Sequence, residues 1–438
     1  MTLLPEQLFT RLEDLEAGPG YRVVEVETDL DPLAVVRAGS HLFGMAVFLS
    51  TPSGERMGGL GSAWRGSTAG SERFTEISYA IADIGLPAGA TVFTGFSFAD
   101  SGPLEESWAG FAAVDAVLPV VTMVANGSVS TVRVTVAPGG DPAALSNVLR
   151  SLRSPAHPPP PDLGDHIIES HPHVADWRAE VAEAVAAIRA GHLQKVVLAR
   201  SVLVRSAMAP DGFDLVHHLD HAYPGCFSFG WAAGGSVFVG SSPELLLSVS
   251  GREVRTNPLA GSAARGEGEL EDRALGDSLM ASRKDRVEHA LVVDDVAARL
   301  QAHATDLTVP DVPSLRKVAT VQHLSTDIRG VLLEGSGLFG VLADLHPTPA
   351  VGGTPRADAT AFIDKIEGID RGWYAGGIGW VRPSGDGTVA LALRCGLIRG
   401  STAHLYAGAG IVADSDPDRE LSETRLKLRP LLELLAAG

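Results

Sequence analysis

DPDRELSETRLK, residues 416–427, is the segment from which the rest of the chain is most readily interpreted. Asp416 is a favoured helix N-cap and Pro417 suits the first helical position, so the sequence predicts a helix that begins here. Pro430, further along, predicts a kink or a restart of that helix. The preceding residues, LYAGAGIVADS, are apolar and rich in glycine, so we expect one helix face to look onto the protein interior.

Three charged residues share one face of this helix. Glu420, Glu423 and Lys427 are spaced i, i+3 and i+7. Two carboxylates directed inward are costly unless something cationic meets them, and Mg²⁺ with an anionic substrate would do so. An exposed, solvated helix face is the more ordinary interpretation of this spacing alone. The metal hypothesis therefore depends on the rest of the chain.

The composition limits the classes of protein that are possible. The chain has 438 residues, 45% of them hydrophobic, so a large core is available, in two or three domains or in one large unit. The formal net charge of −18 argues against nucleic acid as the main partner. An anionic substrate remains compatible with this charge, because a site can be locally positive or carry a metal.

Several features predict a soluble, cytoplasmic protein. The two cysteines, Cys226 and Cys395, lack metal-ligand spacing and are typical of a reducing compartment. The N-terminal residues carry acids early and lack the pattern of a signal peptide, and no apolar run is long enough to span a membrane. No coiled coil or obvious pairing element is present, which predicts a monomer.

The order of the predicted elements favours an α+β fold. Residues 1–150 contain short strands and turns, and the proline-rich segment 154–166 is predicted to be a linker or a surface crossing. Strand pairs followed by long helices, without simple parallel βαβ alternation, indicate α+β. The expected later elements are a helix over 175–190, a strand over 193–204, strands over 227–251, a long helix over 279–303, and strands over 376–398 joined by an SGDG turn.

Two residues suggest proton transfer. Lys195 opens an otherwise apolar strand, where lost solvation lowers the pKa of a lysine and makes it a candidate general base. A strand-end lysine that reaches water is the ordinary alternative. Glu244 has apolar or small neighbours, so burial would raise its pKa and make it an acid matched to a neutral Lys195. A solvated loop acid is the alternative for Glu244.

A second pair of helix carboxylates strengthens the metal hypothesis. Asp285 and Glu288 are spaced i and i+3 in RKDRVEHALVVDD, next to apolar positions. Two such pairs on two helices could converge on one divalent ion. The alternative is ordinary solubilisation of the helix through pairs such as Lys284 with Glu288.

Anion binding is indicated by Arg394, which lies in the apolar segment LALRCGLI. A strand arginine is expensive unless it binds an anion such as a carboxylate, and Tyr374 could add a hydroxyl to the same anion. His323 is a packing histidine by default. Glycines that permit close approach of the backbone to a ligand are Gly261, Gly408 and Gly410.

No GxGxxG, P-loop, GxSxG or HExxH motif occurs in the sequence. What remains is a lysine base, a glutamic acid, four helix carboxylates and an arginine. This set indicates Mg²⁺-assisted chemistry on a small polycarboxylate without a covalent nucleophile.

Residues 168–435 resemble the chorismate-utilising enzymes, a family that includes isochorismate synthase, salicylate synthase and the first components of anthranilate and aminodeoxychorismate synthases. The resemblance implies a large α+β fold with antiparallel sheets packed face to face and helices outside, in which residues 1–160 are a more variable N-terminal part and 168–435 the catalytic core. The segments that carry it are QKVVLAR, SPELLLS, PLAGSAARG, SRKDRVEH, VQHLSTDIRG, HPTPAVGGTPR, WYAGGIGW, LALRCGLI, YAGAGIV and DPDRELSETRLK.

The resemblance also implies roles for individual residues. Glu288 and Glu423 would bind Mg²⁺ directly, with Asp285 and Glu420 assisting. Lys195 would be the catalytic base and Glu244 the catalytic acid. Contacts with the substrate, chorismate, are implied at Gly261, Ser262, His323, Ala350, Tyr374, Arg394, Gly408, Gly410 and Lys427.

Three positions separate the branches of this family. Lys195 matches the water-activating base of isochorismate and salicylate synthases, which the anthranilate enzymes lack. Ala260 stands where aminodeoxychorismate synthases carry a nucleophilic lysine, and Ala350 matches the alanine of isochorismate synthases where lyase-type members carry threonine. One departure is SAARG, where sequences like TRPRG are commoner. The resemblance thus implies isochorismate synthesis that feeds menaquinone or siderophore formation, with salicylate synthesis or a partner-dependent subunit as alternatives.

Overall fold

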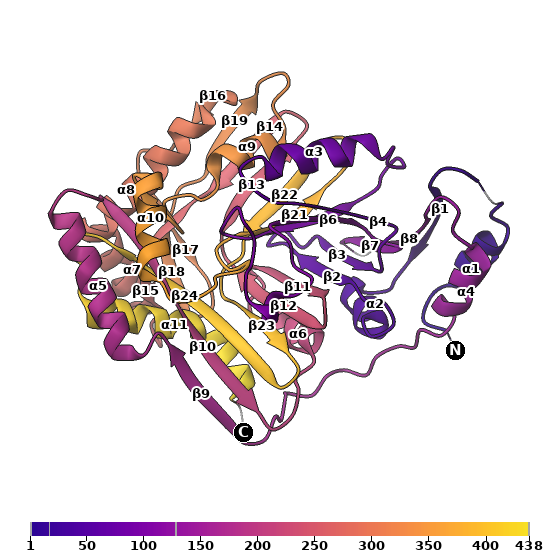
Figure 1. The fold of residues 1–438 in the computed structure, drawn as a ribbon, viewed down its shortest axis with the longest axis horizontal. Coiled ribbons are helices and arrows are strands. Elements are labelled where there is room, and N and C mark those ends of the chain that lie inside the picture. The colour runs from indigo at the N-terminus through magenta and orange to yellow at the C-terminus, as the bar shows by residue number, and fades with distance from the viewer. Residues whose placement is uncertain (1, 17, 128, 437–438) are drawn as a thin grey trace.

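The computed structural model describes residues 2–16, 18–127 and 129–436, and its strands form two large antiparallel sheets and a small one (Figure 1). The 12-stranded sheet has the order β1 (Arg22–Thr28), β8 (Val129–Val136), β7 (Val121–Asn126), β3 (Arg56–Leu60), β2 (Ala46–Ser50), β11 (Phe227–Ala233), β12 (Ser236–Ser242), β23 (Cys395–Arg399), β24 (Thr402–Ile411), β10 (Lys195–Ser206) and β20 (Gly353–Thr354), and β9 (His166–His171) also pairs with β10. The 9-stranded sheet has the order β16 (Ala304–Thr308), β19 (Ile328–Leu332), β14 (Glu253–Asn257), β13 (Leu245–Ser250), β22 (Gly387–Leu391), β21 (Gly377–Val381), β5 (Val92–Phe96), β6 (Val114–Leu118) and β4 (Trp64–Thr68). The 3-stranded sheet has the order β15 (Leu259–Ala264), β18 (Val321–Ser325) and β17 (Ser314–Lys317).

Helices surround these sheets, as Figure 1 shows. They are α1 (Glu6–Glu13), α2 (Pro32–Gly39), α3 (Arg73–Asp83), α4 (Pro142–Leu149), α5 (Val174–Arg189), α6 (Gly212–Ala222), α7 (Glu269–Ala281), α8 (Arg283–Leu300), α9 (Leu338–Leu345), α10 (Arg356–Ile366) and α11 (Pro417–Leu435). The predicted α+β class is confirmed.

The period of two along the strands explains why both faces of the 12-stranded sheet are covered. In β2, Phe48 packs into one hydrophobic cluster, while Val47 and Leu49 point to the opposite face and pack into the other. The cluster that contains Val47 and Leu49 also contains residues of the 9-stranded sheet, such as Phe93. A Cβ on Gly59 of β3 would lie 3.1 Å from the Phe93 ring, so the two large sheets pack directly against each other.

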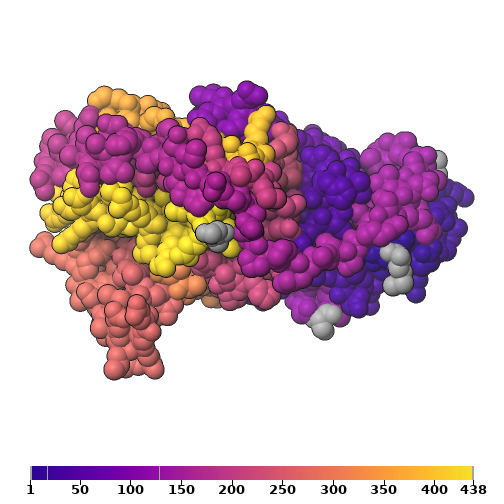
Figure 2. All heavy atoms as spheres, turned by 90° about the horizontal axis from the view of Figure 1, so that it is seen from below, coloured from indigo at the N-terminus to yellow at the C-terminus, as the bar shows by residue number. Residues whose placement is uncertain are grey.

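Strands from before and after the proline-rich linker share both large sheets. β2 pairs with β11, and β5 pairs with β21. Residues 154–165 contain no helix or strand, as the prediction of a linker required, and in Figure 1 they follow the lower edge of the molecule from α4 to β9. In the space-filling view the N-terminal residues form one end of an elongated molecule, and α11 lies in the other half (Figure 2).

The structure corrects three predicted elements. The helix expected over 279–303 is two helices, because Ser282 has an extended backbone and its hydroxyl caps α8 by accepting the Asp285 N–H. Residues 1–150 contain helices as well as strands, and α2 and α4 each begin at an Asp-Pro cap that the prediction overlooked. Helix α11 does not restart at Pro430 but continues through it.

Arg394 was also predicted wrongly, since it lies in no strand. It occupies the link between β22 and β23, with a positive φ of 50°. This link carries the chain from the 9-stranded to the 12-stranded sheet. Glu244 occupies the corresponding link from β12 to β13, where the chain crosses in the opposite direction. The two crossings place both side chains at the boundary between the sheets.

Candidate active site

A cavity of about 650 Å³, including the solvent at its mouth, lies at this boundary. All of the catalytic, substrate-binding and metal-binding residues predicted from the sequence line this cavity, except Asp285 and Glu420. The lining residues are Lys195, Val197, Pro243, Glu244, Leu259, Ala260, Gly261, Ser262, Glu288, His323, Ala350, Val351, Tyr374, Leu393, Arg394, Tyr406, Ala407, Gly408, Gly410, Glu423 and Lys427.

Lys195 is almost completely buried, with 1% of its side chain exposed. The amine cannot reach water in the way that a strand-end lysine usually does, so the ordinary alternative for this residue is excluded. Its Nζ lies 3.0 Å from Glu288 Oε1, on the neighbouring helix α8. β24 passes close to this pair because its residue 410 is glycine: a Cβ there would lie 2.2 Å from Glu288 Oε1 and 3.0 Å from Lys195 Cε.

Glu244 is held as a neutral acid by its surroundings. Burial raises the pKa of its carboxyl to about 8, although the Leu259 N–H and the charges of Lys195 and Lys427 act in the opposite direction. The Leu259 N–H donates to Glu244 Oε1 at 3.3 Å. A carboxyl with this pKa is largely protonated at neutral pH and can donate a proton to a substrate.

Three of the four helix carboxylates pair with lysines. Glu288 of α8 and Glu423 of α11 line the cavity, and Glu423 Oε1 lies 2.7 Å from Lys427 Nζ. Glu420, behind them, is 1% exposed and lies 2.8 Å from Lys284 Nζ. The exposed-face alternative for the Glu420 and Glu423 pair is therefore wrong.

The pKa values of these acids reflect crowding of like charges. Burial raises the pKa of Asp285, and the nearby charge of Glu288 raises it further despite the hydrogen bond from Ser282. Burial and Glu423 together raise the pKa of Glu420. Burial also acts to raise the pKa of Glu423, but Lys427 more than offsets this and the pKa is lowered. Additional positive charge near these acids would relieve the repulsion.

Within residues 2–16, 18–127 and 129–436, no three or more His, Cys, Asp or Glu side chains are clustered tightly enough to hold a metal ion by themselves. Mg²⁺, however, is commonly held by one or two carboxylates together with water and an anionic ligand. Glu288 and Glu423 supply two such oxygen donors on the cavity wall. The donor chemistry of this site therefore fits Mg²⁺.

Another part of the cavity lining carries positive charge and can bind anions. Arg394 Nη2 donates to His323 Nε2 at 2.9 Å, which leaves His323 Nδ1 as the donor to the Gly261 carbonyl at 3.2 Å. Burial and the nearby charges of Arg394 and Lys427 hold the pKa of His323 well below its ordinary value, so the ring is neutral. Among the described residues no carboxylate lies within 4 Å of the Arg394 guanidinium, which leaves its charge available to a ligand.

Tyr374 and Lys427 meet at Gly408 of β24. A Cβ on Gly408 would lie 2.7 Å from the Tyr374 hydroxyl, and Lys427 Nζ donates to the Gly408 carbonyl at 2.9 Å. The Tyr374 ring stacks on Tyr406 with centroids 5.5 Å apart. Burial raises the pKa of Tyr374, so its hydroxyl stays protonated and can donate to an anion.

The sequence reasoning missed Tyr406, although a signal for it was present. In YAGAGIV, residues 406, 408 and 410 alternate along one strand and share one face, so Tyr406 belongs with the two predicted glycines. Val197 and Val351 were missed because apolar lining residues do not differ in sequence from core residues.

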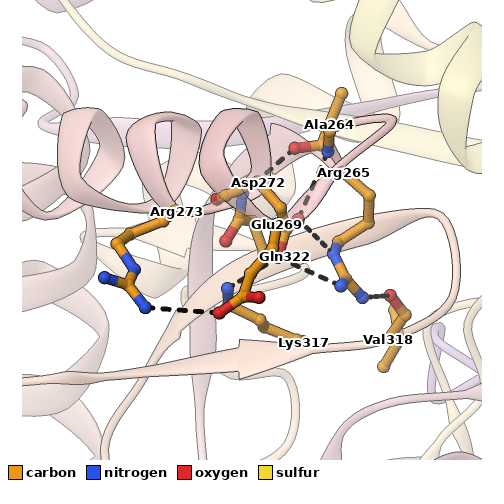
Figure 3. A network of polar contacts seen from close by, with 9 residues as sticks. Ala264, Arg265, Glu269, Asp272, Arg273, Lys317, Val318 and Gln322 are labelled. Carbon is orange, nitrogen blue, oxygen red and sulfur yellow. Dashed lines mark hydrogen bonds and ion pairs between the residues drawn. The ribbon is translucent and has the colours of Figure 1, made fainter.

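A polar network fixes the 3-stranded sheet that carries Gly261, Ser262 and His323. At its centre Asp272 of α7 accepts hydrogen bonds from Arg265 and from Lys317 Nζ, the latter at 2.7 Å (Figure 3). Gln322, next to His323, donates to the Ala264 carbonyl at 3.1 Å. These contacts hold α7 against the 3-stranded sheet and so support one wall of the cavity.

This fold and site define an enzyme-like cavity with an acid, a lysine and hard oxygen donors on its walls. The family description "chorismate binding enzyme" matches residues 16–436, nearly the whole sequence. The chain belongs to this family of enzymes, and the resemblance noted from the sequence is confirmed.

Individual relatives agree with this assignment. The chain is 39% identical over 351 residues to the salicylate biosynthesis isochorismate synthase of Pseudomonas aeruginosa. The aligned region covers 78% of this chain and 74% of the relative. It is 36% identical over 352 residues to the isochorismate synthase MenF of Bacillus subtilis, covering 79% and 75%. The solved structure of MenF, the menaquinone-specific isochorismate synthase from Escherichia coli, matches with a TM-score of 0.84 at 28% identity, over 98% of each chain.

In the part of the chain that the structure describes, no helix combines the length and the apolar character needed to cross a lipid bilayer.

Proposed function

We propose that this protein is an isochorismate synthase, which converts chorismate reversibly to isochorismate. The observation that carries this proposal is the presence of a buried lysine, Lys195, and a buried neutral acid, Glu244, on the walls of one cavity in a member of the chorismate-binding family. The names of the relatives described above support it.

The proposed reaction moves a hydroxyl group without net gain or loss of atoms. Lys195 takes a proton from water, and the oxygen of that water forms a bond to C2 of chorismate. The ring double bonds shift, the bond from C4 to its hydroxyl breaks, and Glu244 gives a proton to the departing oxygen so that water leaves. The enolpyruvyl ether stays intact. Proton exchange with solvent then removes the added proton from Lys195 and returns one to Glu244.

The remaining polar residues would bind the two carboxylates of chorismate. Arg394 and the Tyr374 hydroxyl are proposed to hold the pyruvyl carboxylate, because they are buried donors that lie on the same wall. Lys427 and the backbone at the glycines are proposed to make further contacts. The ring carboxylate would lie on the wall formed by α8 and α11.

Mg²⁺ is part of the proposal. Glu288 and Glu423 would hold it, with Asp285 and Glu420 assisting through water. The bound ion would supply positive charge that neutralises the ring carboxylate and the crowded acids. The protein's own contribution is to hold Glu288 and Glu423 on the cavity wall and to keep Glu288 and Glu420 buried.

Salicylate synthase is the second candidate, since it would add elimination of pyruvate to the same first reaction. Ala350 lies on the cavity wall, where the resemblance associates alanine with isochorismate synthases and threonine with lyase-type members. The proposal therefore ends at isochorismate. We further propose that the product feeds menaquinone or siderophore formation in the cytoplasm, and that the protein acts as a monomer.

Purified protein incubated with chorismate and Mg²⁺ is expected to form isochorismate without pyruvate, and EDTA is expected to abolish the reaction. Chromatography of the products, with a separate assay for pyruvate, measures both. Salicylate together with pyruvate would replace the proposal by the second candidate. Turnover that survives complete chelation would contradict the metal assignment, and turnover only with ammonia and a glutaminase would indicate a partner-dependent subunit.

Gly410→Ala is expected to lower kcat at least about tenfold, since misplaced reacting groups cost this much or more. The added Cβ would meet Glu288 Oε1 at 2.2 Å and must displace it from Lys195. Gly340→Ala in α9, where a Cβ meets nothing within 4 Å, is the matched control and should leave kcat unchanged. Steady-state kinetics compares them, and equal kcat values for both variants would show that the close approach of β24 is unimportant.

A further inference from the structure

One edge of β10, the strand that carries Lys195, is incompletely paired. On this edge β20 pairs with Lys195 and Val196, whereas β9 pairs with β10 only from Ser201 onward. Backbone polar groups of alternate residues in a strand point to the same edge. Val197 and Ala199 therefore direct their backbone groups into the gap between β20 and β9.

The side chains of Glu367 and Arg371 fill this gap. The Ala199 N–H donates to Glu367 Oε1 at 2.6 Å, and Arg371 Nη2 donates to the Val197 carbonyl at 2.8 Å. Arg371 Nη1 also donates to the Val351 carbonyl at 2.9 Å, and its Nε donates to Glu367 Oε2 at 2.7 Å. The pair thus takes the place of a missing strand segment and ties the sheet edge to the loop at Val351.

The same pair connects three walls of the cavity without touching the cavity itself. Val197 and Val351 are lining residues, and both accept hydrogen bonds from Arg371. The Tyr374 N–H donates to the Arg371 carbonyl at 2.9 Å, which adds the wall that carries the Tyr374 hydroxyl. Neither member of the pair lines the cavity, and their side chains are only 4% and 3% exposed.

Attraction between the two charges alone does not account for such a pair. Removing two charges from water is costly, and well-packed hydrophobic residues often replace a buried ion pair without loss of stability. Hydrophobic residues, however, cannot satisfy the buried N–H of Ala199 or the carbonyls of Val197 and Val351. Holding these backbone groups in fixed positions is what the charged pair can do and an apolar pair cannot.

We propose that Glu367 and Arg371 are positioning residues, which fix the strand that carries Lys195 relative to the loop at Val351 and to Tyr374. This inference rests on the proposed function, because the residue to be positioned is the proposed base. A base displaced by about 1 Å can lose on the order of a hundredfold in rate while the substrate still binds. The expected signature is therefore a loss in kcat rather than in KM.

Arg371→Lys tests the proposal while it keeps the charge beside Glu367. A lysine cannot donate to two carbonyls and a carboxylate with the planar geometry of a guanidinium. We expect kcat for isochorismate formation to fall at least about tenfold, with KM within about threefold of the wild type. Glu367→Gln, which can still accept the Ala199 N–H, should lose less activity than Glu367→Ala.

Asp115→Asn is the matched control. Asp115 is also a buried carboxylate, with 0% of its side chain exposed, which pairs with Arg65 at 2.9 Å and accepts the Ala112 N–H at 2.9 Å, but it lies outside the cavity walls. Its kcat per folded molecule should match the wild type even if its Tm falls. The proposal would be overturned if Arg371→Lys and Glu367→Ala both kept a kcat close to the wild type, as Asp115→Asn is expected to do.

Hydrogen exchange at the Ala199 amide gives a readout that needs no turnover. Glu367→Ala removes the acceptor of this amide, so exchange there should be at least about tenfold faster than in the wild type, and Asp115→Asn should not change it. Unchanged exchange would contradict the positioning role. If exchange at Ala199 is faster in Glu367→Ala as expected, but the wild type forms no isochorismate, the proposed function is contradicted. The role of the pair in holding the strand would then still stand.

Discussion

Lys195→Ala is expected to lower kcat for isochorismate formation by roughly a thousandfold, within the range found for loss of a general base. The side chain is buried on the cavity wall, and no other lysine among the described residues lies within 4 Å of Glu288 to replace it. Arg394, Tyr374 and Lys427 remain in place to bind the carboxylates, so affinity for chorismate should change much less than kcat. Steady-state kinetics and calorimetric binding of chorismate measure the two effects separately.

Lys365→Ala is the control for this variant, because Lys365 is exposed and pairs with Glu183 at the surface. Its kcat should equal that of the wild type. Circular dichroism should show that Lys195→Ala stays folded, since Lys195 is the first residue of β10 and Glu288 at the cavity wall can be hydrated. Near-wild-type turnover by folded Lys195→Ala would rule out this lysine as the base.

Glu244→Gln is expected to lower kcat by roughly a hundredfold or more, because an amide cannot donate a proton to the departing hydroxyl. In the wild type the acid must be protonated, and its pKa is about 8. Activity that depends on this group should therefore be full below pH 7 and should fall as the pH rises through about 8. The residual rate of the variant should lack this alkaline limb.

Glu244→Gln should raise the stability of the folded protein although it lowers kcat. The pKa of Glu244 rises from 4.5 in the unfolded chain to about 8 in the folded protein, so the folded state binds more protons between these values. The free energy of unfolding of the wild type therefore decreases as the pH rises from about 4.5 to 8. Glutamine does not ionise, so the variant should gain stability relative to the wild type over that window, by up to a few kcal/mol at its upper end.

Denaturant unfolding at pH 5 and pH 9 measures this difference. Glu169→Gln, at an exposed pair with Arg205, is the control and should show no such gain. A glutamine variant that is less stable than the wild type at pH 9, or a wild type without an alkaline limb in kcat, would contradict the assignment of Glu244 as a buried neutral acid.

Local signals predicted the elements that depend on a few neighbouring residues. The Asp416 cap, the turn between β21 and β22 and the apolar stripe of α5 are each set by backbone geometry or by a short period, and each was found where expected. The break at Ser282 escaped the prediction although serine is a common cap. A serine within a helical segment does not by itself mark a break, because serine also occurs inside helices.

Arg394 and the Glu367–Arg371 pair show what such signals cannot reach. Arg394 was assigned to a strand because its neighbours are apolar, but the chain crosses between two sheets at that point. Glu367 and Arg371 fill a gap between β20 and β9 along β10, and both β9 and β10 lie far from them in sequence. A gap in a sheet edge does not exist until the strands are paired.

By itself, the sequence determined the family, the α+β class and the identity of nearly all the polar residues of the cavity, because spacing along helices and alternation along strands are properties of the chain. The tertiary structure alone decided which charges meet. It placed Lys195 against Glu288 and Lys284 against Glu420, and it made Glu244 a neutral acid. Burial and the distance between charges set these properties, and both arise only when segments distant in sequence pack together.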